Sequence, residues 1–358
     1  MPAFRAKQIA EWVNVHRLSD PAGWSNLASK DRKACERELA VLTGRTIDHH
    51  TASDGTQKLL VEWDDEQDAA GSISTGPLLP VLNGTSGGGG RVDRQTECVM
   101  IPSLDPGSNR KTACISSQVG CPVGCRFCAS GLSGLDGNLS AGRIVEQVWR
   151  LGNLPGVGRI SNVVFMGMGE PLSNFNAVTA AIRTLAAPAP WGLGISARKI
   201  TVSTVGLPKF INRLADEFDL PVTLALSLHA PTDELRRELI PWSSYTTISE
   251  LLESCGRWFE KTGREITLEY TLLGGTNDGP DDARRLAEIA KTVRGNVNLI
   301  RYNEVAGLPF RRPRDGDVHR FQTSLRERGV NAHIRASRGR DIAAACGQLR
   351  HEHAGGSA

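Results

Sequence analysis

From about residue 96 onward, short apolar runs alternate with amphipathic helical patterns, and this alternation limits the fold more than any other feature. Short runs rich in β-branched residues predict strands, whereas apolar residues at every third or fourth position predict helices. The predicted strands are 98–101, 113–117, 162–166, 199–203, 222–228, 265–271, 297–301 and 332–336, and the predicted helices are 142–151, 177–185, 207–214, 248–261, 281–293 and 318–328. Repeated strand–helix units favour a parallel sheet whose right-handed crossovers close it partly into a barrel. The sequence therefore predicts an α/β fold with its site at the carboxyl ends of the strands.

The segments outside this alternation have a different composition. Residues 1–68 begin with a helical pattern in which Ile9, Trp12 and Val13 share one face, and residues 57–63 predict a strand. Residues 69–95 are rich in glycine and poor in large apolar side chains, so they cannot bury enough surface to offset the entropy of ordering. We therefore expect a small, partly helical accessory domain at 1–68, a flexible insertion or linker at 69–95, the α/β domain at 96–349 and a disordered tail at 350–358.

The composition is that of an ordinary globular enzyme, with 40% hydrophobic and 23% charged residues among 358. The chain shows no apolar signal segment at its start and no run long enough to span a membrane, so we expect a cytoplasmic protein with reduced cysteines. Charge is uneven, because residues 301–350 hold eleven arginines and five carboxylates. Arginine suits phosphate recognition, although a solvated basic face explains the same pattern.

Three cysteines, Cys121, Cys125 and Cys128, lie close together with Cx3Cx2C spacing. Thiolates are the usual ligands of iron–sulfur clusters, and three of them would leave one iron of a four-iron cluster open to a small molecule. Zinc is the alternative, with Cys114 as a fourth ligand. However, structural zinc sites favour paired Cx2C units, and only Cys125 and Cys128 form one. A disulfide framework is disfavoured by the cytosolic character of the chain.

Small or polar residues follow several predicted strands. Strand 162–166 leads into the turn 167–171, GMGEP, whose two glycines let the backbone approach a ligand closely. Polar groups follow or end the next strands at Ser203, at Ser227-Leu228-His229 and at Asn303. Any one of these could be a simple cap at the end of a strand. Together they predict a polar rim that binds a small molecule.

These segments resemble a known family. The three-cysteine spacing matches the signature of the radical S-adenosylmethionine (SAM) enzymes, in which the amino and carboxylate groups of SAM bind the open iron. Together with residues 112–121, the GMGEP turn, residues 227–231 and the final motif 338–349, it makes the chain similar to the RlmN/Cfr radical SAM methyltransferases over residues 4–349. The resemblance implies a partial (βα)6-type radical SAM barrel with one 4Fe-4S cluster per chain on Cys121, Cys125 and Cys128. It further implies a SAM site made by Gly169, Glu170, Ser203, Ser227, Leu228, His229 and Asn303.

The resemblance also implies a reaction that uses two SAM molecules per turnover. Cys346 would carry a methyl group from the first SAM, and the second would yield the radical that activates that methyl group for addition to an adenine carbon. Cys114 would then attack the Cys346 sulfur, forming a disulfide and releasing the product. Glu97, five residues before Pro102, would be the base. From the pattern alone, Cys346 lies in an alanine-rich helical stretch, where a free cysteine would usually be a buried packing residue.

By resemblance, the substrates are carbon 2 of an adenosine in 23S rRNA and of the adenosine next to the anticodon in tRNA. The accessory domain would bind RNA, a flavodoxin- or ferredoxin-like protein would supply electrons, and the enzyme would be a monomer with no membrane association. Cfr-type methylation of carbon 8 is the alternative. Two other hypotheses stay open at this point: an iron–sulfur electron carrier or zinc-stabilised RNA-binding protein without catalysis, and a radical SAM enzyme acting on a small molecule or peptide.

Overall fold

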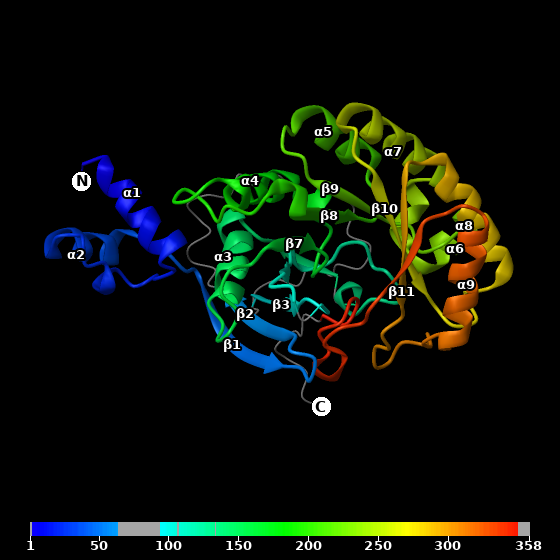
Figure 1. The fold of residues 1–358 in the computed structure, drawn as a ribbon, viewed down its shortest axis with the longest axis horizontal. Coiled ribbons are helices and arrows are strands. Elements are labelled where there is room, and N and C mark those ends of the chain that lie inside the picture. Colours follow the sequence, from blue (N-terminus) through cyan, green and yellow to red (C-terminus); the bar gives the residue numbers. More distant parts are fainter. Residues whose placement is uncertain (1, 64–93, 106, 133, 350–358) are drawn as a thin grey trace.

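The computed structural model describes residues 2–63, 94–105, 107–132 and 134–349 (Figure 1). Their strands form a ten-stranded sheet in the order β1-β2-β3-β4-β7-β8-β9-β10-β11-β12 and a small second sheet, β5-β6. The strands are β1 (Gly44–Thr51), β2 (Gln57–Trp63), β3 (Arg94–Pro102), β4 (Lys111–Cys114), β5 (Gln118–Gly120), β6 (Leu135–Asn138), β7 (Asn162–Phe165), β8 (Ile200–Thr204), β9 (Thr223–Ser227), β10 (Ile266–Leu272), β11 (Gly295–Arg301) and β12 (Ala332–Arg335).

The part of the sheet from β4 to β12 is parallel throughout, and every crossover within it carries at least one helix. The helices are α1 (Phe4–Ala10), α2 (Ser29–Glu38), α3 (Ala141–Gly152), α4 (Phe175–Ala186), α5 (Pro208–Glu217), α6 (Asp233–Leu239), α7 (Ile248–Thr262), α8 (Pro280–Thr292) and α9 (Asp315–Glu327). Figure 1 shows α3, α4, α5, α7, α8 and α9 along the outer side of the curved sheet. This arrangement confirms the α/β class and the partial barrel.

Local sequence explains how these helices begin and end. For α7, the Thr247 hydroxyl accepts a hydrogen bond from the Glu250 N–H while the Glu250 carboxylate accepts one from the Thr247 N–H, a capping box. Gly263 ends the helix in the left-handed conformation. The buried face of α7, which includes Leu251 and Trp258, packs in the same apolar core as the strands. Burial of such faces fixes each helix against the sheet.

The N-terminal helices have an apolar cluster of their own, in which Ile9, Trp12 and Val13 pack against the buried Trp24 and its neighbours. Figure 1 shows α1 and α2 at one end of the molecule, beyond the sheet. The hairpin β1–β2, in contrast, extends the main sheet because β2 pairs antiparallel with β3. Residues 44–63 are thus continuous with the barrel sheet, while the boundary expected at residue 68 stays a prediction.

Two further segments differ from the expectations. β3 begins at Arg94, two residues inside the predicted 69–95 insertion, whose other residues lie outside the described ranges together with the predicted tail 350–358. The alanine-rich stretch before Cys346 is not an α-helix. It contains a single 3₁₀ turn (Arg340–Ile342) flanked by positive φ angles at Gly339 and Ala343. Over the described ranges, no helix combines the length and apolar character needed to cross a bilayer.

Candidate active site

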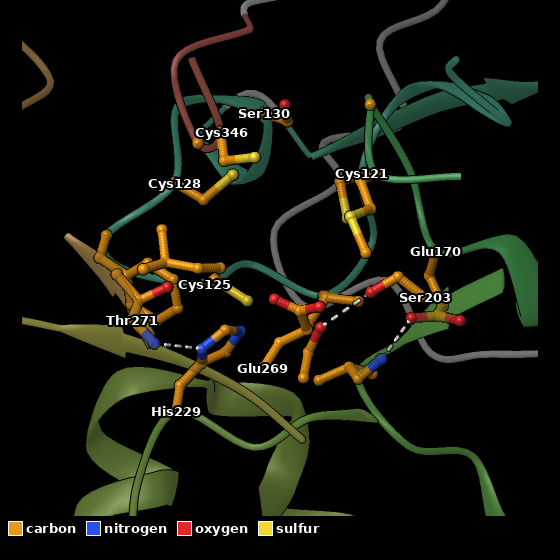
Figure 2. A pocket seen from close by; sticks show the side chains of 18 of the residues that line it. Cys121, Cys125, Cys128, Ser130, Glu170, Ser203, His229, Glu269, Thr271 and Cys346 are labelled. Atoms are coloured by element: carbon orange, nitrogen blue, oxygen red, sulfur yellow. Dashed lines mark hydrogen bonds between the residues drawn. The ribbon is translucent and has the colours of Figure 1, made fainter. Parts of the chain in front are cut away.

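A cavity of ≈ 160 Å³ opens at the carboxyl ends of the parallel strands, where the sequence predicts the site (Figure 2). Side chains reach it from the loop after β5, from the ends of β7 to β12 and from the segment that follows β12. The residues that line it include Cys121, Cys125, Cys128, Gly169, Glu170, Ser203, Ser227, His229, Glu269, Thr271, Asn303, Arg335 and Cys346. Most of the residues predicted from the sequence therefore meet in one place.

The three loop cysteines all line this cavity, whereas Cys114 does not. Burial raises the pKa of each thiol, that of Cys121 to about 12. Thiolates therefore form here only where a bound metal compensates their charge. Within the described ranges, no three His, Cys, Asp or Glu side chains form a group that could hold a metal ion. A four-iron cluster fits this donor set better than a single zinc, because each thiolate then ligates a different iron.

The glycine turn after β7 is shaped by close packing. Gly169 has φ +99°, and a Cβ there would lie 2.6 Å from Gln118 Cβ and 2.8 Å from Ser117 Oγ. Only glycine fits such a position. The adjacent Glu170 carboxylate accepts hydrogen bonds from the N–H groups of Leu172 (2.9 Å) and Val205 (2.8 Å), and burial raises its pKa to about 7. Glu170 thereby joins the loops after β7 and β8 at the edge of the cavity.

His229 is a neutral hydrogen-bond donor in the cavity. Burial lowers its pKa to about 3, and its Nδ1 accepts a hydrogen bond from the Thr271 N–H at 3.0 Å (Figure 2). The ring proton therefore lies on Nε2. Nearby, the hydroxyls of Ser203 and Ser227 are 3.3 Å apart on neighbouring strands. These groups offer the polar contacts that a nucleoside needs.

Leu228 differs from the other predicted cofactor residues. Its side chain is fully buried in the apolar core and does not line the cavity. Its N–H donates to the Glu269 carbonyl of β10. Leu228 therefore positions its neighbours, and a contact of its side chain with a cofactor is not supported by this geometry.

The burial of His229 leads to a pH prediction. The folded protein keeps the ring neutral, whereas the unfolded chain takes up a proton below about pH 6.5, so stability falls as the pH decreases. Asn at this position retains an acceptor and tolerates the positive φ of 57°. Between pH 6 and 5, we expect wild type to lose about 1 kcal/mol more unfolding free energy than His229→Asn. Urea unfolding of both proteins at both pH values, with matched iron content, measures the difference. Equal losses would contradict the neutral ring.

Cys346 lies at the junction of two pockets. It lines the main cavity and also a second pocket of ≈ 30 Å³ that contains Cys114. Figure 2 shows its side chain beside that of Cys128. The Cys346 carbonyl accepts a hydrogen bond from Asn303 Nδ2 at 3.2 Å. Burial, followed by the nearby Cys346, raises the pKa of Cys114 to about 12. Cys346 therefore lies between Cys114 and the loop of residues 121–132, which contains the three cysteines and is called the cluster loop below.

Backbone hydrogen bonds fix the segment that carries Cys346. The Ala129 N–H of the cluster loop donates to the Gly347 carbonyl at 2.8 Å, and Ser130 Oγ donates to the Leu349 carbonyl at 2.7 Å. These bonds begin one and two residues after Cys128. The cluster loop and the Cys346 segment consequently form one hydrogen-bonded unit.

Glu97 lies apart from both pockets. It is largely buried on β3, where alternation along the strand places it on the same face as Val99, which packs with Cys114 and Ala344. Its carboxylate is 2.6 Å from the ammonium of Lys58 on β2. The structure thus places the predicted base next to the Cys346 segment without bringing it into either pocket.

Arg335 and Glu269 are two charged cavity residues that the sequence reasoning did not assign to the site. Arg335 lines both pockets, and its Nη1 lies 3.2 Å from Met166 Sδ. Glu269 accepts hydrogen bonds from Asn298 Nδ2 at 3.2 and 3.1 Å. The pKa of Arg335 is raised by Cys346 and then by Glu269. A charged residue inside a predicted buried strand was the signal that could have identified each of them.

Comparisons with known proteins identify the class. Residues 115–288 match the Radical SAM superfamily. A crystal structure of a radical SAM methyltransferase from Sphaerobacter thermophilus matches the fold with a TM-score of 0.86 and 38% sequence identity, covering 98% of this chain and 94% of that one. The fold and the cavity are those of a radical SAM enzyme.

Curated relatives narrow the class to one family. A protein of Rhodopirellula baltica named "Probable dual-specificity RNA methyltransferase RlmN" is 42% identical over 348 residues, which is 97% of this chain and 85% of that protein. A protein of Salinibacter ruber with the same name is 40% identical over 358 residues, covering 98% and 89%. The chain belongs to the RlmN family of radical SAM RNA methyltransferases, which confirms the family expected from its motifs.

Proposed function

We propose that this chain methylates carbon 2 of an adenosine in 23S rRNA and of the adenosine next to the anticodon in tRNA, using SAM. The relatives' names as dual-specificity RNA methyltransferases support the substrate class. The observation that carries the proposal is the position of Cys346, which lines both the pocket of the three loop cysteines and the pocket of Cys114. The Cys346 sulfur can therefore react first in the pocket of the three loop cysteines and then with Cys114.

We assign the 4Fe-4S cluster to Cys121, Cys125 and Cys128. When bound, the cluster would supply the electron that cleaves SAM reductively, which would give the carbon radical needed to activate the Cys346 methyl group for addition to an unreactive adenine carbon. The backbone of Gly169 and the side chains of Ser203, Ser227, His229 and Asn303 would hold SAM in the cavity that they line. Two SAM molecules are used in each turnover, one as methyl donor and one as radical source.

Cys346 and Cys114 divide the methyl transfer between them. The Cys346 sulfur would take the methyl group by displacement on the first SAM. The radical from the second SAM would then remove one hydrogen atom from this methyl group and become 5′-deoxyadenosine, and the remaining methylene radical would join the adenine carbon. The adduct would regain aromaticity by returning one electron to the oxidised cluster and by giving up the proton on that carbon, for which Glu97 is the proposed base. The Cys114 thiolate then attacks the Cys346 sulfur, so that an S–S bond forms as the carbon–sulfur bond breaks. The electron pair of the broken bond stays on carbon, which takes up a proton to become the methyl group.

Arginines near the cavity support an RNA substrate. Partial burial and the nearby charges of Arg340 and Arg301 lower the pKa of Arg312, while Asp315 and Glu304 offset part of this effect. Three guanidinium groups and two carboxylates therefore influence one another in this region. Arg312 Nη1 donates to the Tyr302 carbonyl at 3.0 Å, next to the Asn303 that contacts the Cys346 segment. Clustered guanidinium groups are suited to the phosphates that flank an unpaired base. The accessory helices of residues 1–68 are the second proposed RNA contact.

These arginines predict a salt-dependent interaction. RNA affinity should decrease linearly as salt rises on logarithmic axes, and Arg312→Ala and Arg340→Ala should each reduce the slope by roughly one. Filter binding of an rRNA fragment across a salt series measures this. Arg257→Ala is the control, since Arg257 lies on α7 and pairs with Asp216 at 2.8 Å. A slope that neither Arg312→Ala nor Arg340→Ala changes would exclude this surface as the phosphate contact.

Mass spectrometry of nucleosides from RNA treated with enzyme and SAM tests the proposed function directly. The expected product is 2-methyladenosine from both an rRNA fragment and a tRNA substrate. Recovery of 8-methyladenosine instead would show that the same two pockets support Cfr-type methylation of carbon 8. RNA without any methyl group, under conditions where SAM is cleaved, would contradict the proposal.

The proposed reaction has three further requirements. A flavodoxin- or ferredoxin-like protein is the proposed electron donor. The RNA substrates imply a cytoplasmic location. The enzyme is proposed to act as a monomer.

A further inference from the structure

A buried ion pair connects β2 with β3 behind the Cys346 segment. Lys58 Nζ is 2.6 Å from Glu97 Oε1, and each side chain is about 10% exposed. In the antiparallel register Lys58 lies opposite Val99, so its side chain shares the face of β3 on which Glu97 projects. Removing one member of such a pair leaves the other charge buried without compensation.

The same ammonium also contacts the C-terminal segment. Lys58 Nζ donates a hydrogen bond to the Ala343 carbonyl at 3.4 Å, three residues before Cys346. Ala343 has φ +49°, an uncommon conformation for a residue other than glycine. Surrounding contacts must hold a backbone in that region. Lys58 is one of these contacts, and its ammonium group bonds to both the Glu97 carboxylate and the Ala343 carbonyl.

A second set of contacts docks the segment without involving Glu97. In the turn between β1 and β2, Asp54 accepts a hydrogen bond from the Gly339 N–H at 3.1 Å and pairs with Arg338 at 3.4 Å. The Ser53 N–H donates to Asp341 at 2.9 Å. The turn therefore anchors the start of the segment, while Lys58 contacts it close to the reactive cysteine. This separation allows docking and positioning to be tested independently.

We propose that Lys58 is a positioning residue. It holds the Glu97 carboxylate in place relative to the Cys346 segment, and product release depends on this arrangement. The inference rests on the proposed role of Glu97 as the base that removes the proton from the adenine carbon. In that step the carbon–hydrogen bond breaks, the proton moves to a Glu97 carboxylate oxygen, and the electron pair stays in the ring. The Lys58 ammonium group holds two things in one arrangement: the Glu97 carboxylate that accepts the proton, and the Cys346 segment that carries the covalent RNA adduct. Methyl loading of Cys346 and SAM cleavage precede this step and do not need Lys58.

The experiment compares Lys58→Met, Lys58→Arg, Glu97→Gln, the double variant Lys58→Met/Glu97→Gln and the control Asp54→Asn in cluster-loaded enzyme. Four quantities are measured: methylated Cys346 in the protein, SAM cleavage, RNA covalently bound to the protein, and methylated RNA released. Thermal unfolding of each variant shows whether it folds. The double variant removes both buried charges, so it is informative even if Lys58→Met is unstable.

For Lys58→Met we expect normal loading and SAM cleavage, accumulated protein–RNA adduct and a 10- to 100-fold slower release of methylated RNA, roughly the range that misplacement of a catalytic group produces. Lys58→Arg should restore most of the rate. The double variant should be no slower than Glu97→Gln, because both changes act on one step. Asp54→Asn weakens docking of the segment but leaves the Lys58–Glu97 pair in place, so it should lower all four quantities together and should not accumulate adduct.

Two results would overturn the inference. One is wild-type release by Lys58→Met together with slow release by Glu97→Gln. The other is equal loss of every activity in Lys58→Met and Asp54→Asn, which would make the pair a docking contact only. Wild-type release by Glu97→Gln has a different meaning, because it would remove Glu97 from the proposed mechanism and with it the basis of the inference.

Discussion

Cys114→Ala should accumulate RNA covalently bound to the protein, whereas Cys346→Ala should form neither adduct nor methylated RNA. Without Cys346 there is no sulfur to carry the methyl group. Without Cys114 the methylene bridge still forms, but no thiolate attacks the Cys346 sulfur to break it. The same chemical change is thus expected to give opposite phenotypes at two residues that line one small pocket. We expect product formation to fall below detection in both variants.

Gel electrophoresis with labelled RNA distinguishes the two outcomes, because the adduct appears as a shifted band that nuclease removes. Mass spectrometry should locate the RNA remnant, and in RNA-free wild type a methyl group, on Cys346. Cys255→Ala is the matched control, since Cys255 is a fully buried cysteine on α7 that lines neither pocket. Normal turnover by Cys114→Ala, or RNA methylation by Cys346→Ala, would contradict the two-cysteine mechanism.

Replacement of Cys121, Cys125 or Cys128 by Ala should abolish SAM cleavage and RNA methylation completely. Each thiol is expected to hold a different iron, so two ligands cannot retain an intact cluster with one open iron. Anaerobically reconstituted wild type should be brown and contain about four irons per chain, the nuclearity expected for this ligation.

Iron and sulfide analysis, visible absorption and release of 5′-deoxyadenosine measure these effects. The Cys255→Ala control should keep both the iron and the cleavage activity. Stoichiometric zinc without iron in reconstituted wild type would contradict the assignment of the three cysteines.

The barrel could be predicted because its strands and helices each follow one hydrophobic period. β1 could not be predicted in this way. After its first residue it is exposed along its whole length, so no alternation between buried and polar residues marks it. β5 and β6 are short strands of three and four residues that pair only with each other, and their pairing depends on the loop fold rather than on periodicity.

The site was predictable where the chemistry lies in one short motif. The three cysteines and the glycine turn are of this kind, and the structure brings both to the cavity. Only the family resemblance pointed to Cys346 as a site residue. Alanine propensity favours a helix there, whereas the structure has tertiary hydrogen bonds to Ala129 and Ser130 instead. Lys58 lies in a strand far along the chain from Ala343, so no local pattern reveals its contact with the Cys346 segment.

The anchoring of the Cys346 segment leads to an expectation about the order in which the enzyme matures. Its anchors are remote in sequence, since Ser53 and Asp341 are separated by 288 positions and Ser130 and Leu349 by 219. Contacts this distant form late, after the strands and helices between them are in place. Once docked, the segment is hydrogen-bonded to the loop to which we assign the iron–sulfur cluster. We therefore expect the metal to be inserted after the barrel has folded but before this segment docks. Maturation of the enzyme would then depend on how fast the cluster is delivered relative to how fast the segment docks.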